Sequence, residues 1–240
     1  MRYLISVSYD GSKLYGFERQ PNKLTVQGEL ERVLSKIAKK KVLIKGAGRT
    51  DRGVHARDQK AHFDLDIDIK PEGLKRAMNS MLDSSIYVNY AKVVNDDFHA
   101  RFDVSKKIYE YKINLGEYDP IINSFCYNYN RKLNVSAMKR AAKYLIGMHS
   151  YEAFTAGERE SYNSIIYKIV FKKDKDILTI KFEGKSFYRY MVRNLVGALM
   201  IVGEGKEKPE VIRDMIKTRK KVKPYVTVPA NGLFLMKVDY

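Results

Sequence analysis

The spacing of apolar residues predicts strands and helices in turn along the first hundred residues. From Tyr3 to Tyr9, large apolar residues alternate with serines, the pattern of a half-buried strand. Thr25 can cap a helix, because the apolar residues after it share one helical face: Val26, Leu30, Val33, Leu34 and Ile37. Further strands are predicted at 41–45, 61–65 and 86–94, a glycine-punctuated loop at 46–55, and a second helix from Pro71.

The second half of the chain repeats this mixture of elements. Tyr109, Tyr111, Ile113 and Leu115 alternate and therefore share one face of a strand. Apolar segments at 165–171 and 177–182 flank Asp174-Lys175, which predicts a hairpin. Helical stripes are predicted at 138–145 and 191–202, a short helix at 210–218, and a final strand at 233–238.

These elements predict an α+β fold, since strands that pair through hairpins alternate with helices able to cover one face of a sheet. We expect two domains, an N-terminal domain at 1–104 and a C-terminal domain at 105–240. They join near residues 103–107, where no disordered linker is apparent.

The charge of the chain narrows the class of partner. Its 240 residues carry 45 basic and 28 acidic side chains, a net charge of +17, which favours a polyanionic partner such as a nucleic acid. A basic membrane-binding or heparin-binding protein would show the same excess. The longest apolar stretch, 195–202, is far shorter than the roughly 20 residues of a membrane span, so no transmembrane segment is predicted. We expect no membrane partner.

Cysteine and histidine usage argues against disulfides and metals. Cys126 is the single cysteine, so no internal disulfide can form, which fits a cytoplasmic location. The four histidines have no tight metal-ligand spacing, and no metal site is expected.

The segment at 46–56, GAGRTDRGVHA, is the strongest candidate for chemistry. Its glycines permit tight turns or close approach to a ligand. They bracket Asp51, which lies between Arg49 and Arg52, and a nearby arginine favours the ionised carboxylate that a nucleophile or base requires. The alternative is structural, because an aspartate in a turn commonly accepts hydrogen bonds from nearby backbone amides.

GRTDRGVHA also resembles the signature of the TruA family of pseudouridine synthases. Other segments resemble the family in the same order along nearly the whole chain: SYDGSKLYGFERQ, TVQGELERVL, RAMNSML, FHARF, KKIYEYKI, SFYRYMVRNLVGAL and NGLFLMKVDY. The resemblance implies the pseudouridine synthase fold. That fold has two similar halves, each a mainly antiparallel sheet covered by helices on one face, with an active-site cleft between them.

The resemblance also implies a role for four residues. Asp51 corresponds to the catalytic aspartate, and Arg49 to the arginine that helps displace the target base from the RNA stack. Tyr109 corresponds to a tyrosine that stacks on that base, although an alternating strand tyrosine is more often a core residue. Arg193 corresponds to the basic partner of the aspartate, and the alternative for it is a solvated helix arginine.

The implied reaction isomerises uridine to pseudouridine at positions 38, 39 or 40 of the transfer RNA anticodon stem-loop. It requires no cofactor, and the resemblance further implies a homodimer that binds transfer RNA. The carboxylate could attack C1′ or assist proton loss at C2′, and the sequence does not choose between these routes. Two other hypotheses are a catalytically silent RNA-binding protein on the same fold and a ribosome-associated basic structural protein.

The chain departs from the family pattern at four places outside Asp51, Tyr109 and Arg193. Phe17 stands where the family often has tryptophan, and Ser150 stands where it has aspartate. A usual proline before Ile86 is missing, and a proline pair near the C-terminus is reduced to Pro229-Ala230. These departures bear on RNA contacts and loop shape and leave the reaction unchanged.

Overall fold

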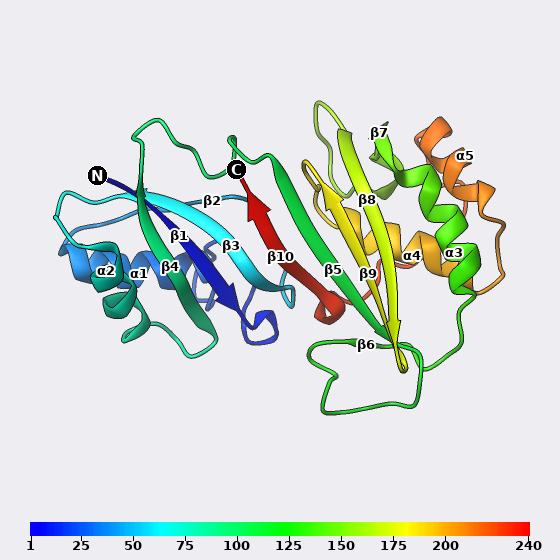
Figure 1. The fold of residues 1–240 in the computed structure, drawn as a ribbon, viewed down its shortest axis with the longest axis horizontal. Coiled ribbons are helices and arrows are strands. Elements are labelled where there is room, and N and C mark those ends of the chain that lie inside the picture. The colour runs from blue at the N-terminus through cyan, green and yellow to red at the C-terminus, as the bar shows by residue number, and fades with distance from the viewer. The chain divides into compact units, whose positions relative to one another are not determined.

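The computed structural model describes all residues, 1–240, and divides into two compact units (Figure 1). The first unit comprises Met1–Ser105 together with Phe234–Tyr240, and the second comprises Lys106–Leu233. Both units combine helices with a mainly antiparallel sheet, so the α+β class is confirmed. The predicted C-terminal domain contained all of 105–240, whereas in the structure the last seven residues pack with the first unit.

The sheet of the first unit has the strand order β4-β1-β3-β10. Strands β1 (Arg2–Tyr9), β3 (His55–Asp64) and β4 (Ile86–Val94) are antiparallel. β10 (Leu233–Asp239) runs parallel to β3, with Phe234 opposite His55, and the short β2 (Lys45–Gly46) also pairs with β3. The parallel pairing of β10 places the final strand in the first unit.

Two helices lie on one face of this sheet, α1 (Val26–Ala38) and α2 (Pro71–Asn79) (Figure 1). Thr25 caps α1 as predicted, since its side chain accepts a hydrogen bond from the Gly28 amide. The alternating residues Tyr3, Ile5 and Val7 of β1 are fully buried in the core of the unit. Leu4 and Ser6, which point to the opposite face, are buried as well, so both faces of β1 are covered.

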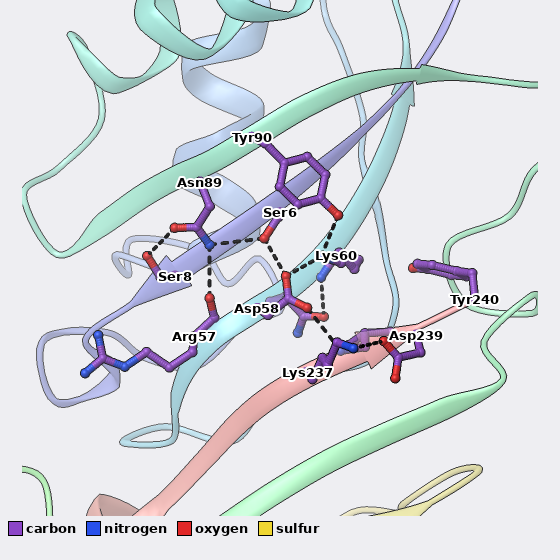
Figure 2. Close-up of polar contacts among 12 residues, drawn as sticks. Ser6, Ser8, Arg57, Asp58, Lys60, Asn89, Tyr90, Lys237, Asp239 and Tyr240 are labelled. Atoms are coloured by element: carbon purple, nitrogen blue, oxygen red, sulfur yellow. Dashed lines mark hydrogen bonds and ion pairs between the residues drawn. The ribbon is translucent and has the colours of Figure 1, made fainter.

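Polar side chains from four strands meet on the other face of the sheet (Figure 2). Asp58 accepts hydrogen bonds from the Ser6 hydroxyl (2.5 Å) and the Val238 amide (3.2 Å), and it forms an ion pair with Lys60. Lys60 also donates to the Tyr90 hydroxyl at 2.7 Å, although its side chain is only 5% exposed. This cluster links β1, β3 and β4 through side chains and reaches β10 through the Val238 amide.

The sheet of the second unit has the order β5-β9-β8-β7, with all three pairings antiparallel. Its strands are β5 (Lys106–Asn114), β7 (Gly147–Ser150), β8 (Asn163–Asp174) and β9 (Ile177–Gly184), and β6 (Tyr127–Asn128) pairs with β5 in parallel. The predicted hairpin at Asp174-Lys175 is confirmed, because β8 and β9 pair in register up to Asp174 opposite Ile177.

The helices of the second unit are α3 (Val135–Ala142), α4 (Met191–Gly203) and α5 (Glu210–Thr218). Short 3₁₀ turns complete the elements of both units: η1 (Gly11–Lys13), η2 (Lys143–Leu145), η3 (Glu152–Phe154) and η4 (Ala230–Gly232). All residues of α4 except Arg193 are buried, in agreement with its apolar sequence. Arg193 is thus the exception on an otherwise buried helix.

The predicted strand at 41–45 is wrong over most of its length, because only Lys45 begins β2. The amides of Val42 and Ile44 donate to the side chains of Ser35 and Glu31 on α1, at 2.9 and 3.2 Å. Their hydrogen-bonding capacity is therefore satisfied by a helix and not by a neighbouring strand. The predicted loop at 46–55 ends one residue earlier than expected, since His55 already belongs to β3.

Candidate active site

The loop between β2 and β3, residues 47–54, carries Asp51 and is here called the Asp51 loop. Asp51 is half-buried, Thr50 before it is buried, and Arg49 and Arg52 are exposed. The Val54 amide donates to the Asp51 carbonyl at 3.1 Å and closes a turn. Gly53 within this turn has φ +85°, a conformation that favours glycine. Along the sequence, this turn places Asp51 between two exposed arginines.

The segment that follows β1 packs closely against the Asp51 loop. The Phe17 amide donates to the Thr50 carbonyl at 3.1 Å. A Cβ atom at Gly11 would lie 2.0 Å from the Val54 carbonyl oxygen, and one at Gly16 would lie 3.0 Å from the Thr50 carbonyl oxygen. The glycines of the SYDGSKLYGF segment therefore allow the two backbones to meet.

Charged and aromatic side chains of these two segments pair with one another. Arg49 forms an ion pair with Glu18, at 2.6 Å between Nη2 and Oε1, and both side chains are largely exposed. The guanidinium of Arg52 lies over the Tyr15 ring, 4.4 Å from its centroid, and Lys23 lies 4.6 Å from the same centroid. Cation–π attraction to the Tyr15 ring therefore holds Arg52 of the Asp51 loop and Lys23 of the neighbouring segment.

Tyr109 lies in β5 of the second unit and is 7% exposed. Its ring meets Phe187 edge-on, with centroids 5.1 Å apart, and in register it stands opposite Phe182 of β9. The structure thus agrees with the core-aromatic alternative. Its proposed stacking on a base stays a prediction.

Arg193 lies in the first turn of α4, and its guanidinium is oriented by two contacts. Its Nε donates to the Val228 carbonyl at 2.7 Å, and the guanidinium carbon lies 5.0 Å from the centroid of the Tyr190 ring. Tyr190, which precedes α4, has a left-handed backbone with φ +61°. The alternative of a solvated helix arginine does not hold, because Arg193 is half-buried and anchored.

Asp51 and Arg49 thus belong to the first unit, and Tyr109 and Arg193 to the second. Sequence reasoning missed the side chains that hold the Asp51 loop, Tyr9 and Gln59. The Tyr9 hydroxyl lies 2.8 Å from the Thr50 hydroxyl, and Gln59 donates to the Gly48 carbonyl at 3.0 Å. The alternating pattern marks Tyr9 only as a core residue, and no signal singles out Gln59.

The structure can be searched for clusters of metal ligands and for a reactive thiol. No group of three or more histidine, cysteine, aspartate or glutamate side chains is arranged to hold a metal ion. Cys126 is buried, and burial raises the pKa of its thiol to about 11, which disfavours the reactive thiolate. None of the helices is long and apolar enough to cross a membrane.

Comparison with known proteins places the chain in a family. A sequence model of the family described as tRNA pseudouridine synthase matches residues 5–103 and 141–240. The chain therefore belongs to the tRNA pseudouridine synthase family.

Bacterial relatives resemble the chain over its full length. A protein of Thermosipho melanesiensis is 40% identical over 99% of this chain and 98% of its own length. A protein of Pseudothermotoga lettingae is 41% identical over 100% of this chain and 99% of its own. A third, from Listeria monocytogenes, is 40% identical over the same shares. All three bear the name tRNA pseudouridine synthase A.

Among solved structures, one match is a chain from an H/ACA ribonucleoprotein bound to a substrate RNA containing 2′-deoxyuridine. It covers 83% of this chain and 53% of that chain, with 11% identity and a TM-score of 0.32. A likeness this low has no bearing on the fold or the site.

Proposed function

We propose that this protein isomerises uridine to pseudouridine at positions 38, 39 or 40 of the transfer RNA anticodon stem-loop, with Asp51 as its catalytic carboxylate. The observation that carries the proposal is the Asp51 loop itself. This chain belongs to the family and contains the GRTDRGVHA motif. The aspartate of the motif lies in sequence between two exposed arginines, on a loop that is hydrogen-bonded at both ends.

The reaction exchanges one bond to the ribose for another. The C1′–N1 bond of the uridine breaks, and a C1′–C5 bond forms after the detached uracil turns. The proton on C5 is lost and N1 gains one, so no redox partner or external nucleophile is consumed. The Asp51 carboxylate can serve by attack on C1′ or by proton removal at C2′. Neither route requires a cofactor.

The other three residues receive supporting roles in this proposal. Arg49 helps displace the target base, which costs a few kcal/mol of unstacking. Tyr109 stacks on the displaced uracil, an interaction worth about 1–3 kcal/mol per base. Arg193 balances the charge of Asp51. Its contacts with Val228 and Tyr190 support this role, since an arginine held in one orientation loses less entropy when it pairs.

Transfer RNA binding through phosphate contacts fits the net charge of +17. We further propose that the protein is a homodimer, as the family resemblance implies, and that it works in the cytoplasm. Light scattering of the purified protein tests the first of these points, because a monomeric mass at assay concentration would contradict it.

The decisive test is an isomerisation assay on unmodified transfer RNA, with pseudouridine mapped by carbodiimide-blocked primer extension. We expect the wild-type protein to modify one or more of positions 38, 39 and 40. Asp51→Ala should bind the same RNA and form no product. Asp68→Ala is the matched control, because Asp68 is an exposed aspartate in the loop before α2 of the same unit.

Two results would contradict this proposal in different ways. A wild-type protein that forms no pseudouridine on any transfer RNA would favour the alternative of a silent RNA-binding protein. An Asp51→Ala variant as active as Asp68→Ala would leave the activity in place and remove the role of Asp51.

A further inference from the structure

Two buried side chains hold the Asp51 loop at points just before the carboxylate. Tyr9 is the last residue of β1 and 6% exposed, and its hydroxyl lies 2.8 Å from Thr50 Oγ1. Gln59 of β3 is 1% exposed, and its Nε2 donates to the Gly48 carbonyl at 3.0 Å. The two contacts lie on either side of Arg49, and Thr50 directly precedes Asp51.

The Gln59 side chain is itself held in place. Its Oε1 accepts a hydrogen bond from the Lys60 amide at 3.1 Å, which sets the orientation of the carboxamide. Burial raises the pKa of Tyr9 to about 12, so the phenol keeps its proton at neutral pH. Tyr9 and Gln59 are both buried core residues, so a bound RNA has little access to either side chain.

We propose that Tyr9 and Gln59 are positioning residues for Asp51. They hold the Thr50 side chain and the Gly48 carbonyl, and through them the orientation of the carboxylate, while neither touches the substrate. Catalysis by a fixed group depends on its placement, and an error of about 1 Å can lower a rate roughly 100-fold. This inference rests on the role proposed above for Asp51.

Tyr9→Phe tests the proposal, because it removes the hydroxyl and keeps the ring. The chain offers a matched control in Tyr3→Phe. Tyr3 lies on the same face of β1, is fully buried, and also donates one hydrogen bond, to the Ile69 carbonyl at 2.8 Å. Both variants lose one buried hydrogen bond from the same strand, but only Tyr9 reaches the Asp51 loop.

The measurements are single-turnover rates with saturating enzyme and the dissociation constant for transfer RNA. We expect Tyr9→Phe to lower the single-turnover rate roughly 10- to 100-fold with RNA affinity within about twofold of wild type. Tyr3→Phe should keep the wild-type rate within about twofold. Gln59→Leu should act as Tyr9→Phe does, since it leaves the Gly48 carbonyl without its donor.

Amide hydrogen exchange adds a readout that is independent of turnover. Tyr9→Phe should accelerate exchange at residues 47–54, and Tyr3→Phe should not. The double variant Tyr9→Phe/Thr50→Val should be no slower than the slower single variant, because both changes remove one hydrogen bond. Thr50→Ser should retain the wild-type rate, since it retains the hydroxyl.

The possible results distinguish a failure of the positioning role from a failure of the catalytic role proposed for Asp51. If Asp51→Ala is inactive while Tyr9→Phe keeps the wild-type rate and wild-type exchange, the positioning role is overturned alone. Equal rate losses in Tyr9→Phe and Tyr3→Phe would also overturn it, because they would indicate a general effect of the lost core hydrogen bond. An active Asp51→Ala variant overturns the role of Asp51 and the positioning role together.

Discussion

The guanidinium of Arg49 is paired with the carboxylate of Glu18, 2.6 Å away. Glu18 follows Phe17, whose amide holds Thr50, so the same short segment anchors the Asp51 loop and neutralises its first arginine. An RNA phosphate or base that engages Arg49 must compete with Glu18. If Arg49 has the role proposed for it, we expect Glu18 to oppose RNA binding at this point of the loop.

Glu18→Gln should strengthen transfer RNA binding about two- to fivefold at low salt. An exposed ion pair is worth about 0.2–1 kcal/mol, which sets the size of the effect. The gain should shrink with added salt, because screening weakens the pair and the RNA contact alike. Glu160→Gln is the control, since it removes the same charge from an exposed position in the second unit. Equal gains in both variants would point to net charge alone.

Arg193→Lys should lower the single-turnover rate roughly 100-fold, the scale of losing one oriented charge in an active site. A lysine ammonium cannot reproduce the Nε donor to Val228 and the planar contact with Tyr190 at once. Arg213→Lys on α5 is a suitable control, because Arg213 is exposed and pairs with its neighbour Asp214. A lysine variant with the wild-type rate would remove Arg193 from the site.

The buried ion pair of Figure 2 should matter for stability and not for turnover per folded molecule. Lys60→Met leaves the Asp58 carboxylate without its buried partner, which should cost about 2–3 kcal/mol, less than for a fully buried pair because Asp58 is 19% exposed. The double variant Asp58→Asn/Lys60→Met should recover part of this loss. Urea unfolding of the three proteins measures both steps, and a double variant less stable than Lys60→Met would contradict the account.

The stability of the protein should fall between pH 6.5 and pH 4 partly through His62. Burial is the main cause that lowers the pKa of His62 from 6.5 to about 4. The unfolded chain then binds a proton in this range that the folded protein does not, so the free energy of unfolding decreases as the pH falls. His62→Asn, which keeps an acceptor for the Ala100 amide, should reduce this decrease by about 1–2 kcal/mol.

Thermal or urea unfolding at pH 7, 5.5 and 4 checks the His62 prediction. The comparison depends on the change with pH and not on the stability at one pH. An identical pH profile in wild type and His62→Asn would show that the imidazole does not titrate on unfolding.

Local signals in the sequence predicted most elements correctly. Thr25 before an apolar stripe predicted the start of α1, and the cap forms through Gly28 as expected. The strand at 41–45 was wrong because Val42 and Ile44 are satisfied by side chains of α1, a choice that depends on tertiary packing. Nothing local indicated that the chain ends by pairing in parallel with β3, since this contact joins residues far apart in the sequence.

In the candidate site, too, some residues could be predicted from a sequence motif and others could be found only from the packing in the structure. Asp51 is recognisable because its neighbours form an unusual run of glycine and arginine. Tyr9 is not recognisable in this way, because the alternating pattern of a strand predicts that the tyrosine is buried but does not predict the hydrogen-bond partner of its hydroxyl. A residue that acts by holding another is visible only when both are placed in space.

The parallel pairing of β10 with β3 also bears on how the protein is made. Ribosomes release a chain from its N-terminus onward, at about 5–20 residues per second. Yet the strand that begins at His55, just after the Asp51 loop, lacks its neighbours until Phe234 and Leu235 have left the exit tunnel. The first unit must therefore wait, with one sheet edge unpaired, while the entire second unit is synthesised. An incomplete chain that stops at Leu233 would carry every residue of the candidate site and still lack the strand that closes the sheet of its first unit.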